Sequence, residues 1–401
     1  MTSSAALRYS DFRIYWLAMT FSAAGAWLQI VAVSLLVLQL SNGSAAALGV
    51  VALVQAGAFF LFALVGGGFA DRIERRRLLL VTQSALLLLA LLLGILAATG
   101  VVRLWMVVVL AFASSVVLSF DQPARAAFLP SLVPESAMLS AIALQTMVFT
   151  GASAVAPALA GILIQRFGIP INFFLNAASY LAVILALVLI KPRLAAGPRR
   201  GGPLARSVSE GLRQLRSDRA LFWVLSGFAV LLFAAPSMPL FLPVFAEAVL
   251  RTGSRSLGFL FSAYGAGAVF ATLSIERFGG SVRKGQLYLI AFGLSAGALM
   301  WASRSRQMGA LAAALFLLGA SQNAVAVTTV ALLQSRVAAA MRGRMMSVNT
   351  LLIMGLRPLG DFPLALLIAG FGAPGTALLS ALLIGGYGLW LRMRRTDVWS
   401  I

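Results

Sequence analysis

The stretch that decides the fold is Asp71-Arg72-Ile73-Glu74-Arg75-Arg76-Arg77, a charged run between two long apolar segments. Gly66-Gly67-Gly68-Phe69-Ala70 leads into it, and Leu78-Leu79-Leu80 opens the segment that follows. Because hydrocarbon cannot solvate such a run, both segments must be helices that end here on one side of a membrane. The neighbouring arginines predict that this side is the cytoplasm.

The composition of the whole chain agrees with a membrane protein. Of its 401 residues 61% are hydrophobic and 10% charged, and the mean hydropathy is +0.97. Those values exceed what a soluble domain of this length shows. Cysteine and histidine are both absent, which excludes disulfides, thiolate nucleophiles and the usual zinc and haem ligands. We therefore expect no cofactor, no metal and no enzyme activity, and any proton coupling must use carboxylates.

Apolar stretches of about 20 residues divide the chain into twelve predicted membrane crossings. They are 13–40, 45–70, 78–99, 102–120, 138–164, 171–190, 220–246, 256–278, 285–303, 308–333, 346–371 and 374–392. With the N-terminus inside, twenty-four lysines and arginines lie at cytoplasmic connections and six at the other side. The net charge of +20 thus sets topology rather than binding nucleic acid, and both termini are predicted in the cytoplasm. The expected fold class is an all-α polytopic membrane protein.

A long break and an internal repeat predict two halves. The break, 191–219, begins with proline and glycine and continues with leucines at helical spacing among arginines, typical of an amphipathic helix on the membrane surface. It separates residues 1–190 from 220–401. A constant offset superposes Gly151 on Gly355, Phe167-Gly168 on Phe371-Gly372, and Pro170 on Pro374. We expect two pseudo-symmetric six-helix bundles around a central cavity.

Two motifs resemble a known transporter family. The spacing Gly67-x-x-x-Asp71-Arg72-x-x-Arg75-Arg76 resembles the loop between helices 2 and 3 of the major facilitator superfamily. The stretch from Phe120-Asp121-Gln122-Pro123 to Pro134 resembles the region after helix 4 in bacterial transmembrane secretion effectors, the branch that includes enterobactin exporters. The resemblance implies drug:proton antiport by alternating access, in a monomer of the bacterial inner membrane surrounded by its lipids.

The same resemblance implies a conformational latch built from Gly67, Asp71, Arg72, Arg75, Arg76 and Asp121. Asp71 would face the N-terminus of helix 11 near Met345, where unpaired N–H groups carry positive charge. An arginine of the loop, Arg75, would pair with Asp121. The alternative is that the charged run serves only as a stop-transfer and topology signal.

Arg357 and Asp361 are the deepest charges in the sequence, one helical turn apart in segment eleven. Charges at that depth cost several kcal/mol unless paired or wetted, so we expect both side chains to face the cavity. Asp361 is the candidate proton or cation-substrate site, with Arg357 as its partner. The alternative is a permanent buried salt bridge that shapes the helix around Pro358.

Further polar residues in the crossings could line the cavity or form hydrogen bonds between helices. They are Gln29, Gln55, Gln145, Asn176, Gln322, Asn323 and Asn349. In helix 5, Gly151, Pro157 and Gly161 resemble a degraded antiporter motif and predict a hinge, with ordinary kinked packing as the alternative. The expected function is export of a small amphipathic molecule. A lysophospholipid carrier or an importer is the alternative, and an intramembrane enzyme or a ligand sensor is the alternative from another class.

Overall fold

The computed structural model describes residues 5–70, 74–190, 218–247, 253–278, 283–337 and 339–394. Every regular element within those ranges is helical, and eleven of the helices are long and apolar enough to cross a membrane. The predicted amphipathic helix of the 191–219 break, apart from its last two residues, lies outside the described residues. So do Asp71 and Arg72 of the charged run.

The first bundle contains six long helices, preceded by the short helix η1, Ala5–Arg8. They are α1 Ser10–Leu40, α2 Ala45–Ala70, α3 Arg75–Ala98, α4 Leu104–Phe128 with the short η2 Leu129–Ser131 behind it, α5 Glu135–Phe167, and α6 Pro170–Leu189. Helix α1 packs on α5 and α6, and α4 packs on α2 and α3. Many large apolar side chains of these helices are exposed, which suits contact with lipid.

The second bundle is built in the same way. Its elements are α8 Arg219–Ala234, α9 Met238–Phe245, α10 Ser254–Phe278, α11 Lys284–Arg304, α12 Met308–Arg336, α13 Ala339–Leu351, the π-helical turn Leu352–Leu356 and α14 Arg357–Arg394. Asp218 caps α8 by accepting a hydrogen bond from the Leu221 N–H at 3.1 Å. Helix α12 packs between α10 and α11.

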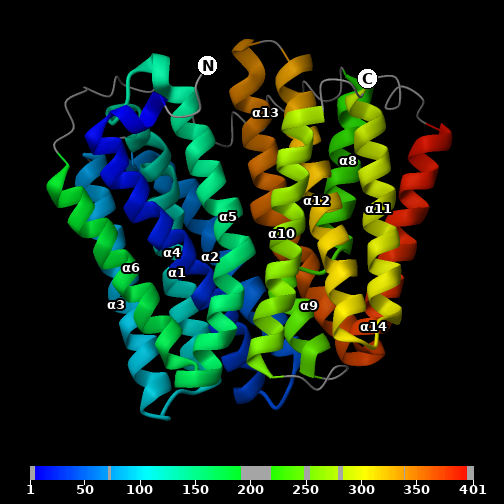
Figure 1. Cartoon of the computed structure of the whole chain (residues 1–401), viewed down its shortest axis with the longest axis horizontal. Coiled ribbons are helices and arrows are strands. Elements are labelled where there is room, and N and C mark those ends of the chain that lie inside the picture. The colour runs from blue at the N-terminus through cyan, green and yellow to red at the C-terminus, as the bar shows by residue number, and fades with distance from the viewer. Residues whose placement is uncertain are drawn as a thin grey trace.

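Helix α14 contains the second part of the eleventh crossing, which begins in α13 and the π-helical turn, and the whole of the twelfth. Its backbone leaves helical geometry at Gly372, with φ of 72° and ψ of 167°, and the chain turns back there. In Figure 1 the orange arm descends to the end of the molecule opposite the start of α1, and the red arm climbs back. The predicted segments eleven and twelve are these two arms, so α1 begins and α14 ends at the same end of the molecule.

The two halves share a distinctive turn. Gly168 after α5 has φ of 81° and ψ of 172°, close to the values at Gly372, and a proline follows two residues later in both places. Positive φ of this kind is readily adopted only by glycine. The repeat that the sequence predicted at Gly168 and Gly372 is therefore also a repeat of backbone conformation.

The bundles meet through symmetry-related helix pairs, α5 with α10 and α14 with α2. The Ala158 N–H donates to Ser262 Oγ at 2.9 Å, and Ser254 Oγ donates to the Gly161 carbonyl at 3.3 Å. Gly258 and Gly265 lie so close to the α5 backbone that an added Cβ would clash with it. These contacts lie toward the end of the bundle opposite the start of α1.

The seventh crossing differs from the prediction of one continuous helix over 220–246. It is broken between α8 and α9, with extended backbone at Ala235 and Ser237. Pro236 lies within the break and Pro239 in the first turn of α9, and a proline inside a helix removes a backbone hydrogen bond. Hydropathy does not register the break because the residues on both sides are apolar.

Candidate transport site

Arg357 and Asp361 lie near the middle of the eleventh crossing, between the start of α13 at Ala339 and the turn at Gly372. Asp361 is eleven residues before that turn, roughly 16 Å along a helix. The hydrocarbon core of a bilayer is about 30 Å thick, so this position is close to its midplane when the turn lies at the membrane surface. Asp361 is 4% exposed and Arg357 is half-buried, so both charges are largely withdrawn from bulk water.

The carboxylate of Asp361 binds the backbone at the break in the seventh crossing. Its Oδ1 accepts a hydrogen bond from the Ser237 N–H at 2.9 Å, at the N-terminus of α9. The first N–H groups of a helix have no partner within the helix and carry partial positive charge. Asp361 therefore satisfies one of these groups and is stabilised by them, and it links α14 directly to α9.

Arg357 has a different partner from the one predicted. Its Nη2 donates to Gln322 Oε1 at 3.5 Å, and the Tyr264 hydroxyl donates to the same oxygen at 2.9 Å. Within the described residues, Arg357 and Asp361 form no ion pair at 4 Å or less. The two charges lie close enough to attract each other without direct contact, because the α9 N-terminus binds the carboxylate and Gln322 of α12 accepts from the arginine. The coupling role of the pair stays a prediction.

The other predicted polar residues are divided between packing and open positions. Asn176 donates to Gln29 at 2.5 Å between α6 and α1, and Asn323 donates to the Ala268 carbonyl at 2.9 Å and to Thr272 at 2.8 Å. These bonds join helices. Gln55 is exposed, Gln145 is half-buried, and buried Asn349 has a side-chain oxygen without a partner.

The predicted hinge residues of α5 lie along the contact with α10. Pro157 and Gly161 are buried, and an added Cβ at Gly161 would meet the Ser254 carbonyl. Gly151 has open space beside it. Pro157 and Gly161 therefore lie in the contact between the bundles, which agrees with a hinge and with ordinary kinked packing alike, and the hinge role stays a prediction.

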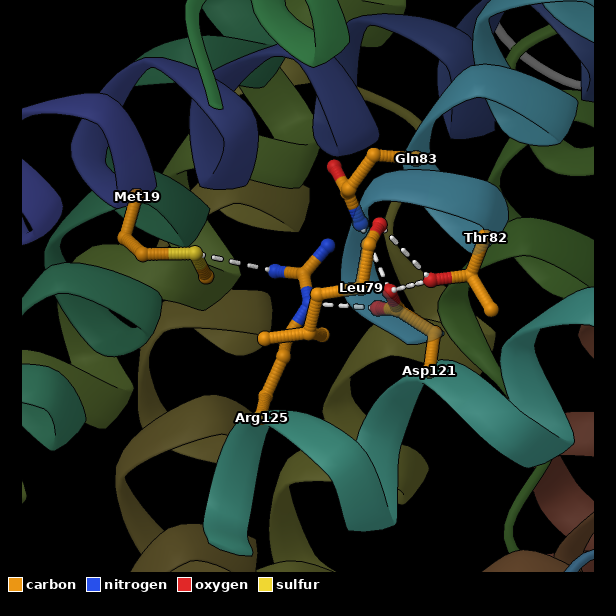
Figure 2. A network of polar contacts seen from close by, with 6 residues as sticks. All are labelled: Met19, Leu79, Thr82, Gln83, Asp121 and Arg125. Carbon is orange, nitrogen blue, oxygen red and sulfur yellow. Dashed lines mark hydrogen bonds and ion pairs between the residues drawn. The ribbon is translucent and has the colours of Figure 1, made fainter. Parts of the chain in front are cut away.

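Asp121 is the buried centre of a polar network in the first bundle, shown in Figure 2. It is 0% exposed and forms an ion pair with Arg125 one turn further along α4. Thr82 and Gln83 of α3 both donate to its Oδ1 at 2.7 Å, and Arg125 Nη1 lies 3.1 Å from Met19 Sδ of α1. The network ties α1, α3 and α4 together.

This network corrects the predicted pairing of Asp121 with Arg75. Among the described residues the cation at Asp121 is Arg125, whose spacing of four places it directly above the carboxylate. That spacing was present in the sequence and could have identified the pair. Arg76 points elsewhere and donates to the carbonyls of Leu187 and Val188 at 2.7 and 2.9 Å, which satisfies the C-terminus of α6. Gly67 lies in α2, and the latch role of Gly67, Asp71 and Arg72 stays a prediction.

Twelve apolar crossings in two related bundles, with buried charges inside each bundle among the described residues, define a secondary-transporter architecture. The chain belongs to the transmembrane secretion effector family, which it matches over residues 1–396. It is 28% identical over 389 residues to the enterobactin exporter EntS of Escherichia coli, covering 94% of this chain and 89% of that protein. The Shigella boydii exporter of the same name has the same identity and coverage.

Solved transporter structures share the fold. A bacterial homologue of the human lysosomal transporter Spinster, in an inward-facing and unoccupied conformation, has a TM-score of 0.74 at 12% identity, over 98% of this chain and 97% of that one. The nucleoside transporter NupG has a TM-score of 0.72 at 11% identity, over 98% and 100%. A POT family transporter in complex with 5-aminolevulinic acid has a TM-score of 0.77 at 10% identity, over 97% of both chains.

Proposed function

We propose that this protein exports a small amphipathic molecule, drug-like or siderophore-like, across a bacterial inner membrane in exchange for protons. Both termini lie in the cytoplasm, and the protein works as a monomer. The observation that carries export is the family match over nearly the whole chain, together with exporter relatives that align over 94% of it. The charge pattern supports the orientation, because described arginines gather at the end of the bundle where α1 begins.

The position of the bundle contacts supports an alternating-access cycle. The contacts of α5 with α10 and of Gly49 with Ala365 lie at the end opposite the start of α1. In the proposed orientation that end faces outward, so the described state is closed to the outside. The loop residues Gly67, Asp71 and Arg72 would latch the inner end in the opposite state, which requires the two bundles to rock.

Asp361 is the proposed proton site. It is the deep carboxylate of the second bundle, and its bond to the α9 N-terminus favours the ionised form by donating to it. A proton that arrives from outside would weaken this bond and release α9 from α14. Arg357, one turn away, would oppose protonation when it turns toward the carboxylate, so substrate binding at Arg357 and proton binding at Asp361 would be coupled.

The test is flux into everted membrane vesicles over a panel of fluorescent amphipathic compounds. We expect accumulation that depends on an acidic vesicle interior and stops when an uncoupler collapses the gradient. Asp361→Asn should lose the pH dependence but keep the fold, because an Asn oxygen can still accept from the Ser237 N–H. Asp218→Asn is the matched control, since it changes a carboxylate at the start of α8 and should keep the pH dependence.

Two results would contradict the proposal. Accumulation that persists with the uncoupler would remove proton antiport, and pH dependence that persists in Asp361→Asn would assign the proton to another group. Accumulation confined to a lysophospholipid probe would reassign the substrate class to lipid while leaving the transporter assignment intact.

A further inference from the structure

Three side chains from three helices meet at mid-depth in the second bundle. Gln322 is at the midpoint of α12, Tyr264 is in the middle part of α10, and Arg357 begins the regular part of α14 after a π-helical turn. Tyr264 and Arg357 both donate to the side-chain oxygen of Gln322. We call these residues the Arg357 cluster.

The cluster carries a positive charge that forms no ion pair with the described residues. Arg357 forms no ion pair within the described part of the chain, and its contact with Gln322 is long at 3.5 Å. The nearest carboxylate along the helix, Asp361, is engaged by the N-terminus of α9. A guanidinium has five N–H donors, so this half-buried group retains donors for a further partner.

Gln322 adds a second unmet donor. Its side-chain oxygen is occupied by Tyr264 and Arg357, and its amide nitrogen is buried without a partner. Gln322 is only 7% exposed, and a buried donor left unpaired is unfavourable. The cluster therefore offers hydrogen-bond donors and a positive charge. Within the described residues it lacks an anionic group that would accept those hydrogen bonds.

The cluster lies close in sequence to a contact between the bundles. Gly355, two residues before Arg357, faces the ring of Phe60 from α2 of the first bundle, so closely that an added Cβ would meet that ring. Apolar helices surround the guanidinium and the amide of the cluster. A cation and an amide in such surroundings fit an amphipathic molecule with an acidic group.

We propose that the Arg357 cluster recognises the anionic group of the exported molecule, so that the substrate is an amphipathic organic anion with a planar pair of oxygens such as a carboxylate. This inference rests on the proposed export function for its biological role, but binding itself can be tested without transport. A planar guanidinium matches two such oxygens in a bidentate arrangement that an ammonium cannot reproduce.

The test uses the purified full-length protein in detergent and three probes with one ring system, namely 2-naphthoate, 2-naphthamide and 2-naphthylmethylamine. Calorimetric titration should show that naphthoate binds about tenfold or more tightly than the amide, with no binding of the amine. Arg357→Gln should abolish this preference, and Arg357→Lys should retain only part of it. Tyr264→Phe should weaken naphthoate binding by about threefold, because the hydroxyl orients Gln322.

Arg306→Gln is the matched control, since it removes an exposed arginine between α11 and α12 and should leave naphthoate affinity unchanged. Equal affinity for the three probes, a preference for the amine, or unchanged naphthoate binding in both Arg357 variants would overturn the inference. Competition by added phosphatidylglycerol that is lost in Arg357→Gln would reassign the site to a lipid headgroup and also overturn it.

Failure of this inference and failure of the export proposal give different results. Export of neutral or cationic probes that is unaffected by Arg357→Gln would leave the proposed function standing and remove the anion site. Selective naphthoate binding without flux in vesicles would support the site and contradict export.

Discussion

At the scale of single residues, buried charge is handled differently in the two bundles. Asp121 in the first bundle has Arg125, Thr82 and Gln83 around it, so its charge is compensated by a cation and by hydrogen bonds. Asp361 in the second bundle is compensated by a helix terminus instead. The first arrangement links three helices of one bundle to each other. In the second, the carboxylate keeps its hydrogen bond only while the N-terminus of α9 stays beside α14.

Replacing Asp121 with Asn should strongly destabilise the protein. The change leaves Arg125 buried without its counter-ion, a situation that costs about 3–5 kcal/mol in proteins. Thermal unfolding of the purified variant in detergent measures the effect. The double variant with Asp121→Asn and Arg125→Met should recover most of the loss, and a double variant as unstable as the single one would show that the ion pair is not the cause.

At the scale of helices, the close contact between α5 and α10 depends on glycines, which have no side chain. Gly258 and Gly265 of α10 approach the backbone of α5 at Pro157 and Ser153, closer than any Cβ would allow. Small residues at such crossings let the backbones come together and permit one helix to slide on the other. The same helices are those through which the two bundles touch.

Gly265→Ala should therefore impair both stability and flux. An added methyl group would overlap the Ser153 carbonyl, and overpacking of this kind costs about 1–3 kcal/mol. Gly293→Ala on α11 is the matched control, because that glycine has open space around it and alanine favours helix. The measurements are thermal stability and vesicle flux of both variants. If the two variants have equal stability and equal flux, the contact between α5 and α10 tolerates a wider separation of the helices.

The helices themselves were largely predictable from the sequence, while their breaks were not. The spans and their order follow from apolar length, and the turn at Gly372 follows from its match to Gly168. The break at Pro236 was missed because apolar residues flank it on both sides. Arg357 and Asp361 were found from depth alone, but their partners Gln322 and Ser237 depend on how three helices, α14, α12 and α9, are rotated against each other, which hydropathy does not encode.

At the scale of the whole molecule, the two bundles touch along α5 with α10 and along α2 with α14, and the proposed transport cycle requires these contacts to open. The absence of cysteine from all 401 residues makes this directly testable, since introduced cysteines are the only thiols. Ala158 of α5 and Ser262 of α10 are in hydrogen-bond contact at 2.9 Å across the bundle boundary.

A cysteine pair at Ala158 and Ser262 should lock the described state. After oxidation we expect vesicle flux to fall to background, and a reductant should restore it. Each single-cysteine variant under the same oxidant provides the control. Full flux with a disulfide confirmed by mass spectrometry would mean that α5 and α10 stay together throughout the cycle.

The charge of Arg357, which forms no ion pair within the described residues, also bears on the energy source. A bacterial membrane is negative inside, and moving one elementary charge through it is worth about 2.3 kcal/mol per 100 mV. A negative solute carried outward and a proton carried inward would both run down that voltage, so their contributions would add. An exporter with a cationic receptor at mid-depth would thus draw on the electrical part of the proton-motive force twice in each cycle, and would keep expelling its cargo where the pH difference is small.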